Sequence, residues 1–174
     1  SLSGRHWIVR HASRAWGTTE TVSELIRGIT ATAEALPGGG RPMVADISRR
    51  RGGRFRPHRS HTSGRDVDVT FYRNDVVSTP IFSRTTRYTM DHARQWYLFK
   101  YWIERDLVTY IFIDNRLQRS LYDFAAEQGE SPELLEEAFG RVRGRGILRY
   151  SPGHDDHFHV RFVCAESDPT CRDS

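Results

Sequence analysis

Three features are scarce in this sequence, and each shortage narrows the class of protein. Lysine occurs once, at Lys100, although Lys and Arg together number 26, so arginine carries the positive charge. Apolar residues never form a run close to the roughly 18 that a membrane-spanning helix requires, so no such helix is predicted. Cysteine occurs twice, which is too few for a zinc site built mainly from thiolates.

Length and composition predict one domain over residues 1–174, because 37% of the residues are apolar and a chain of this size can bury a core. Basic side chains outnumber acidic ones by 26 − 22 = 4. This excess suits an anionic partner, and both nucleic acid and cell-wall polymer qualify. The preference for arginine fits bidentate contacts to anions, and it fits equally the codon usage of a GC-rich genome.

The two cysteines lie in a polar C-terminal segment, CAESDPTC. Six residues separate Cys164 from Cys171, so we predict a disulfide that closes a small loop within a tail at 164–174. A disulfide indicates an oxidising compartment; the alternative is a pair of reduced, exposed thiols. The N-terminal SLSGRHWIVR has no apolar core of the kind found in signal peptides. Two alternatives stay open: the protein is intracellular, or its leader is absent from this sequence.

Apolar periodicity predicts helices and strands in irregular order. Helices are expected at 21–36, 90–106, 115–128 and, after the capping Ser131, from Pro132 onward. For the first helix, Thr21 and Glu24 are interpreted as a capping box. Strands are expected at 42–48, 66–72, 108–113, 147–150 and 157–163. The pattern predicts an α+β fold with a small, largely antiparallel sheet flanked by helices.

Histidine is clustered in two windows that lie far apart in the chain. Five of the eight histidines fall within HRSHTSGRDVDVTF and GHDDHFHVRF. The windows contain His58, His61, Asp66, Asp68, His154, Asp155, Asp156, His157 and His159. Composition alone does not account for this clustering, so the two windows are candidates for a common site.

Alternation within the windows predicts which side chains share a face of the sheet. His157 and His159 are two residues apart, so on a strand they point to one side while Phe158 points into the core. Asp66 and Asp68 alternate with valines in the same way. Either pair alone is weak evidence for a metal site, since HxH pairs are common and two aspartates can simply lie on a solvated edge strand. Together they supply histidine nitrogens and a carboxylate, which are typical ligands of a catalytic zinc with one position open for water.

A His, six residues, an Asp and a distant HxH resemble the signature shared by lysostaphin-type peptidases, D-Ala-D-Ala metallopeptidases and hedgehog-like domains. Within that group, SHTSGRDVDV and GHDDHFHVRF are similar to the penicillin-insensitive murein endopeptidases, as is the N-terminal RHWIVRHASRAWGT. The resemblance covers nearly the whole chain and is sharpest at 55–70 and 150–162.

The resemblance implies a set of site residues. His61, Asp68 and His159 would be the ligands of a Zn²⁺ ion. His157 would lie beside the metal-bound water as a base or a stabiliser of the transition state. His58 and His154 match further active-site histidines of the family, which could polarise the water, bind metal weakly or stabilise an oxyanion.

Asp156 marks a departure from one branch of the group. It stands three residues before His159, where D-Ala-D-Ala peptidases carry a catalytic Glu. Two roles stay open for it: a general base, or a partner that orients a histidine.

The implied activity is hydrolysis of peptidoglycan cross-links, between D-Ala and meso-diaminopimelate, by a periplasmic or secreted zinc endopeptidase. A D,D-carboxypeptidase or an L-Ala-D-Glu peptidase would use the same metal site. A non-catalytic, zinc-containing cell-wall binding module is a third alternative, but it predicts loss of a ligand or an auxiliary histidine, and none is lost. A nucleic-acid binder would leave the residues that flank both motifs unexplained. The sequence does not indicate an oligomeric state.

An arginine-rich segment precedes the first window. It contains Arg49, Arg50, Arg51, Arg54, Arg56 and Arg59. Such a run can bind nucleic acid or can be a solvated loop. Because it leads directly into the motif around His61, we expect it to form a wall of the cleft. There Arg54, Arg56 and Arg59 would bind the carboxylates of peptide stems.

Overall fold

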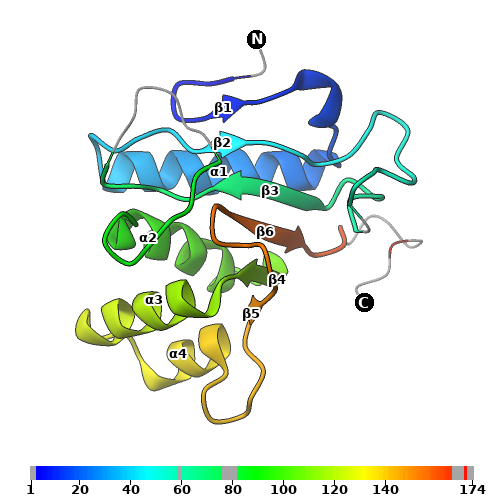
Figure 1. Cartoon of the computed structure of the whole chain (residues 1–174). Coiled ribbons are helices and arrows are strands. Elements are labelled where there is room, and N and C mark those ends of the chain that lie inside the picture. The colour runs from blue at the N-terminus through cyan, green and yellow to red at the C-terminus, as the bar shows by residue number, and fades with distance from the viewer. Residues whose placement is uncertain (1–2, 59, 76–81, 166–170, 172–174) are drawn as a thin grey trace.

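A single mixed sheet forms the centre of the structure (Figure 1). The computed structural model describes residues 3–58, 60–75, 82–165 and 171. Among these, the strands are β1 (Ile8–Val9), β2 (Met43–Val44), β3 (Asp66–Thr70), β4 (Val108–Ile113), β5 (Leu148–Tyr150) and β6 (His157–Phe162). Their order in the sheet is β1-β2-β3-β6-β4-β5. The three central pairings are antiparallel, and β1–β2 and β4–β5 are parallel.

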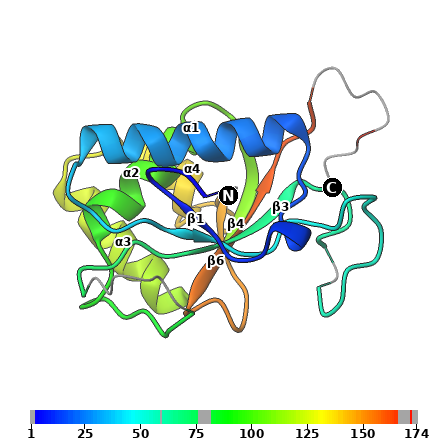
Figure 2. The ribbon, with the colours of Figure 1, turned by 90° about the horizontal axis from the view of Figure 1, so that it is seen from above.

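Helices flank the sheet, which confirms the predicted α+β class. They are α1 (Thr19–Ala35), α2 (His92–Ile103), α3 (Asn115–Glu127) and α4 (Pro132–Phe139), with a short 3-10 turn at Ala12–Arg14. Figure 2 shows α1 running along one side of the sheet. No helix in the described ranges is both long and apolar enough to span a membrane.

The core lies between the sheet and the helices α1 and α2. Phe158 of β6 packs edge-on against Phe99 of α2, with ring centroids 4.9 Å apart, and Trp102 lies 6.2 Å away. The Trp102 indole N–H donates to the carbonyl of Glu24 on α1. Val67 on β3 is fully buried on the same side. The apolar members of the alternating strands therefore face α1 and α2, and the polar members face the opposite side.

One prediction about local structure needs correction, and one alternative is excluded. The capping box is wrong, because α1 begins before Thr21: Thr18 is the N-cap, and its side chain accepts from the Thr21 N–H. The alternative in which Asp66 and Asp68 are solvated on an edge strand is excluded. Since β3 lies between β2 and β6, both carboxylates are buried inside the sheet.

Other local predictions are confirmed. Ser131 caps α4 by accepting from the Leu134 N–H, with Pro132 in the first turn. The predicted strand at 108–113 coincides with β4. The strand expected at 42–48 shortens to β2, although Ser48 still forms a bridge with Ala15. Cys164 and Cys171 form the predicted disulfide.

An ion pair joins α2 to the turn that precedes α4. Lys100 Nζ lies 2.7 Å from Glu130 Oε2, and the Trp96 indole N–H donates to Glu130 Oε1 at 2.9 Å. Burial raises the pKa of Glu130, but the hydrogen bonds from Lys100 and Trp96 outweigh it, and the net pKa is lowered. The ionised carboxylate therefore stabilises the fold.

We predict that Glu130→Gln lowers the free energy of unfolding by about 1 kcal/mol at pH 7 and by much less at pH 3. A carboxylate with a lowered pKa contributes stability above its unfolded pKa and loses it as the pH falls through its folded pKa. Urea unfolding at both pH values measures the difference. Glu127→Gln, at an exposed position of α3, is the control and should change neither value. Equal destabilisation by Glu130→Gln at both pH values would contradict the prediction.

Candidate metal centre

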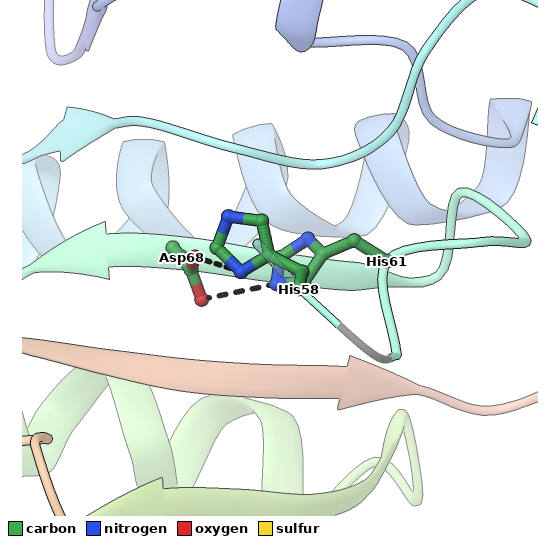
Figure 3. Close-up of side chains that lie close together, drawn as sticks. All are labelled: His58, His61 and Asp68. Atoms are coloured by element: carbon green, nitrogen blue, oxygen red, sulfur yellow. Dashed lines mark ion pairs between the residues drawn. The ribbon is translucent and has the colours of Figure 1, made fainter. Parts of the chain in front are cut away.

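The face of the sheet opposite α1 and α2 carries residues from both histidine windows. In the ladder between β3 and β6, Asp68 pairs with His159 and Thr70 pairs with His157. Paired residues point to the same side of a sheet. The alternation in the sequence therefore predicted the shared face correctly. His61 reaches this face from the loop that precedes β3 (Figure 3).

Three atoms of the predicted ligands lie close to one another. His61 Nε2 is 3.2 Å from His159 Nδ1 and 3.2 Å from Asp68 Oδ1, and His159 Nδ1 is 3.0 Å from Asp68 Oδ1. Zinc binds nitrogen and oxygen at about 2.0–2.1 Å in a tetrahedron, whose corners are then about 3.3 Å apart. The triangle formed by these three atoms fits one face of such a tetrahedron. All three residues are buried.

His58 is a fourth candidate ligand. His58, His61 and Asp68 offer atoms within 4.8 Å of one another, so this group could hold a metal ion. Figure 3 shows both imidazoles beside the Asp68 carboxylate, and His58 Nδ1 is 3.6 Å from Asp68 Oδ2. His159 nevertheless gives the tighter triangle, because its three separations are 3.0–3.2 Å, whereas His58 Nδ1 is 3.6 Å from the Asp68 carboxylate. The geometry favours His159 as the third ligand and places His58 at the rim.

Hydrogen bonds fix the orientation of both inner histidines. The Nδ1 of His61 lies 2.8 Å from the carbonyl oxygen of Ile47, to which it donates, so its Nε2 keeps a lone pair for a metal. The Nε2 of His159 lies 2.9 Å from Asp66 Oδ1, and a donated proton there leaves Nδ1 as the ligand atom. Such partners raise the basicity of a ligating imidazole and hold its ring in place. The three candidate ligand atoms and the groups that hydrogen-bond to their side chains therefore fit a zinc ion.

Buried charge makes this cluster receptive to a cation. Burial raises the pKa of Asp68, but its contacts with His159 and His61 outweigh this effect and hold that pKa well below its usual range. Burial lowers the pKa of His159, but hydrogen bonds to Asp66 and Asp68 raise it to about 9. In the protein without metal, the His159 imidazolium thus neutralises the two carboxylates. A metal ion would take over that role and displace the proton.

The other two histidines of the second window, His154 and His157, lie beside the triangle. His157 Nε2 is 3.8 Å from Asp68 Oδ1, and His157 Nδ1 is 2.5 Å from Asp156 Oδ1. Of the two roles left open for Asp156, this contact favours the one that orients His157. His154 lies 4.9 Å from His157 between ring centroids. Burial and the charge of His157 lower the pKa of His154, so its imidazole is predominantly neutral at pH 7.

Two residues next to the site were missed from the sequence. Arg14 forms a bidentate pair with Asp46, with Nε–Oδ1 at 2.6 Å and Nη2–Oδ2 at 2.8 Å. Asp46 in turn binds His58. Burial raises the pKa of Asp46, but the bonds from Arg14 and His58 lower it overall. The available signal was an acidic residue inside the apolar segment PMVADIS, where a buried carboxylate needs a partner.

The arginine-rich segment borders the site mainly through an aromatic ring. Phe55 is buried, and its ring lies 5.7 Å from that of His58. Arg54 and Arg56 are exposed, and no ion pair in the described ranges involves them. Arg59 lies outside the described residues. The substrate-binding role of these arginines stays a prediction.

Comparison with known proteins gives one family. The family model for penicillin-insensitive murein endopeptidase matches residues 1–174, the full length of the chain. A search of curated proteins returned no match.

We predict that changes at Asp66 weaken zinc binding about 10- to 100-fold, with Asp66→Asn near the lower limit and Asp66→Ala near the upper. The reason is that His159 loses the carboxylate that fixes its Nε2 proton. Competition with a chromophoric chelator measures the affinity, and circular dichroism checks the fold. Asp123→Asn, at an exposed position of α3, is the control. A folded Asp66→Ala variant with wild-type affinity would refute this role.

Proposed function

The chain belongs to the penicillin-insensitive murein endopeptidase family and is thus a hydrolase of peptidoglycan, and from that premise we propose that it is a zinc peptidase that cuts the D-Ala to meso-diaminopimelate cross-link. The observation that carries the metal assignment is the triangle of 3.0–3.2 Å between His61 Nε2, His159 Nδ1 and Asp68 Oδ1. We take these three residues as the zinc ligands. When bound, zinc supplies Lewis-acid activation of a water molecule and of the scissile carbonyl.

His157 is the general base in this proposal. Its Nδ1 is held by Asp156, so Nε2 faces the ligand cluster and accepts the proton of the attacking water. The same nitrogen then returns the proton to the amine that leaves. Asp156 positions the ring and favours the protonated form that occurs between the two transfers.

His154 and His58 complete the surroundings of the scissile bond. The Nδ1 of His154 lies 3.1 Å from the carbonyl oxygen of Pro152, to which it donates, so its Nε2 is an acceptor for a substrate N–H or for water. His58 is held from the other side by Asp46 and orients the water or the developing oxyanion. Arg54, Arg56 and Arg59 would bind stem carboxylates at the wall of the site.

We place the enzyme in the periplasm or outside the cell, where peptidoglycan lies. The disulfide between Cys164 and Cys171 supports this location, since disulfides persist in oxidising compartments.

The direct test is digestion of purified cross-linked muropeptides, followed by mass spectrometry. We expect the zinc-loaded wild type to convert dimers into monomers, EDTA to stop the reaction and added zinc to restore it. Asp68→Asn should lower the rate by at least about 100-fold, because it removes the anionic ligand, whereas Asp123→Asn should not change it. Intact dimers with trimmed stems would instead indicate a D,D-carboxypeptidase, and cleavage near the start of the stem an L-Ala-D-Glu peptidase. Unchanged muropeptides at stoichiometric zinc would overturn the proposal in favour of a binding module.

A second prediction separates the base from the ligands. His157→Gln should lower kcat by about 10²- to 10⁴-fold, since it removes the proton acceptor. Its zinc affinity should stay within about threefold of wild type, since the three ligands are intact. His61→Gln is the matched comparison and should lose zinc. If His157→Gln also loses zinc, His157 is a ligand and the proposed division of roles is wrong.

A further inference from the structure

The row of paired residues that contains two proposed ligands continues across the sheet to an arginine. Asp68 pairs with His159, His159 pairs with Phe112, and Phe112 pairs with Arg149. These ladders join β3, β6, β4 and β5, which lie side by side in Figure 1. Paired residues share a face of the sheet, and neighbouring strands are about 4.8 Å apart. Arg149 therefore lies on the ligand face, about 10 Å along the row from His159.

Aromatic rings form the surface between the ligands and Arg149. The ring of Phe112 lies 5.6 Å from that of His159 and stacks on Tyr110 at 4.4 Å. The guanidinium of Arg149 lies 5.4 Å from the centre of the Tyr110 ring. Cation and rings thus form one continuous surface that starts at the metal centre, and the rings hold the arginine over the ligand face of the sheet.

Arg149 differs in its partners from Arg14 and Arg161, the two arginines that contact carboxylates of the site. Arg14 pairs with Asp46, and Arg161 lies 3.8 Å from Asp66 Oδ1. Arg149 is partly buried and donates from Nε to the carbonyl of Gly146, but no carboxylate within residues 3–58, 60–75 and 82–165 pairs with it. Burial and the charge of Arg145 lower its pKa. A partly buried cation without a counter-charge gains more from an incoming anion than a solvated one does.

We propose that Arg149 is a specificity residue that binds a carboxylate of the substrate peptide beside the scissile bond. The inference rests on the proposed function and names a recognition site within it. In the D-Ala to diaminopimelate cross-link, the carbon that bears the scissile nitrogen also bears a carboxylate. An extended peptide spans about 3.3–3.6 Å per residue, so a group one or two residues from the scissile carbonyl lies within reach of an arginine at this row position. Guanidinium and carboxylate match as a bidentate pair.

The surroundings of Arg149 leave room for the substrate. Arg149 lines a pocket of about 880 Å³ between α4, the segment 141–147 and β5. Arg141, Arg143 and Arg145 line the same pocket, as do Glu133, Glu136 and Glu137, so the lining carries both signs of charge. The remainder of the stem peptide can extend into this space once its carboxylate is bound.

The test compares two muropeptide dimers that differ at one group. In one, the diaminopimelate carboxylate beside the scissile nitrogen is free; in the other, it is a carboxamide. We expect wild type to prefer the free acid by about 10- to 100-fold in kcat/KM, as for a hydrogen bond to a charged group. Arg149→Gln should raise KM for the free acid and leave KM for the carboxamide nearly unchanged. The ratio of the two kcat/KM values should therefore fall towards one. Arg149→Lys should keep part of the preference for the free acid, because lysine retains the positive charge but cannot form the bidentate contact of a guanidinium.

A control variant separates recognition from structure. Arg105 also lies over an aromatic ring, that of Tyr101, with 3.9 Å to its centre, and it follows α2, away from the metal centre. Arg105→Gln should leave both substrates and their ratio unchanged. If Arg149→Gln slows both substrates equally, or if wild type cleaves both equally well, the specificity role is overturned while the proposed function stands.

Failure of the proposed function gives a different result. In that case wild type cleaves neither dimer, and calorimetric binding of the two intact dimers to wild type and Arg149→Gln decides the inference separately. Tighter binding of the free acid, lost in Arg149→Gln, would support a carboxylate site in a binding module. Equal affinities for both dimers would overturn it.

Discussion

Antiparallel pairing of β3 with β6 brings Asp68 against His159, residues separated by 91 positions in the chain. The rest of the candidate site is built around this pair. His61 contacts both of its members from the loop, and Asp66 holds His159 from the same strand as Asp68. The packing of Phe158 against Phe99 supports the pair from the other face, because it fixes the side to which β6 turns its histidines.

The same pairing buries two carboxylates inside a sheet, where an isolated charge is strongly unfavourable. Each carboxylate is compensated by two side chains: Asp68 by His61 and His159, and Asp66 by His159 and Arg161. Asp46, at the rim, is compensated by Arg14 and His58. The site is thus a connected set of opposite charges rather than separate ion pairs. Removal of one member leaves a buried partner incompletely compensated, so such a set holds its side chains in defined positions.

Local patterns in the sequence predicted the parts of the fold that depend on local physics. Alternation placed His157, His159, Asp66 and Asp68 on one face, and Ser131 with Pro132 predicted the start of α4. The start of α1 was misplaced because Thr18 and Thr21 are both good caps, and the choice between them depends on tertiary contacts such as the Thr18 N–H to Gly64 carbonyl bond. Asp46 and Arg149 were missed for a related reason. Their positions follow from a loop path and from strand order, and neither leaves a periodic signal.

The order of the strands along the chain has a consequence for biosynthesis. β6 follows every other described strand in the sequence, yet it occupies a central place in the sheet and supplies His159. A growing polypeptide that has not reached residue 159 holds His61 and Asp68 without the third proposed ligand and without the strand with which β3 and β4 both pair. On the proposed ligand assignment, metal binding, closure of the sheet and hydrolytic competence therefore arise together, once β6 has been made. An enzyme with this topology has no complete candidate site until β6 joins the sheet.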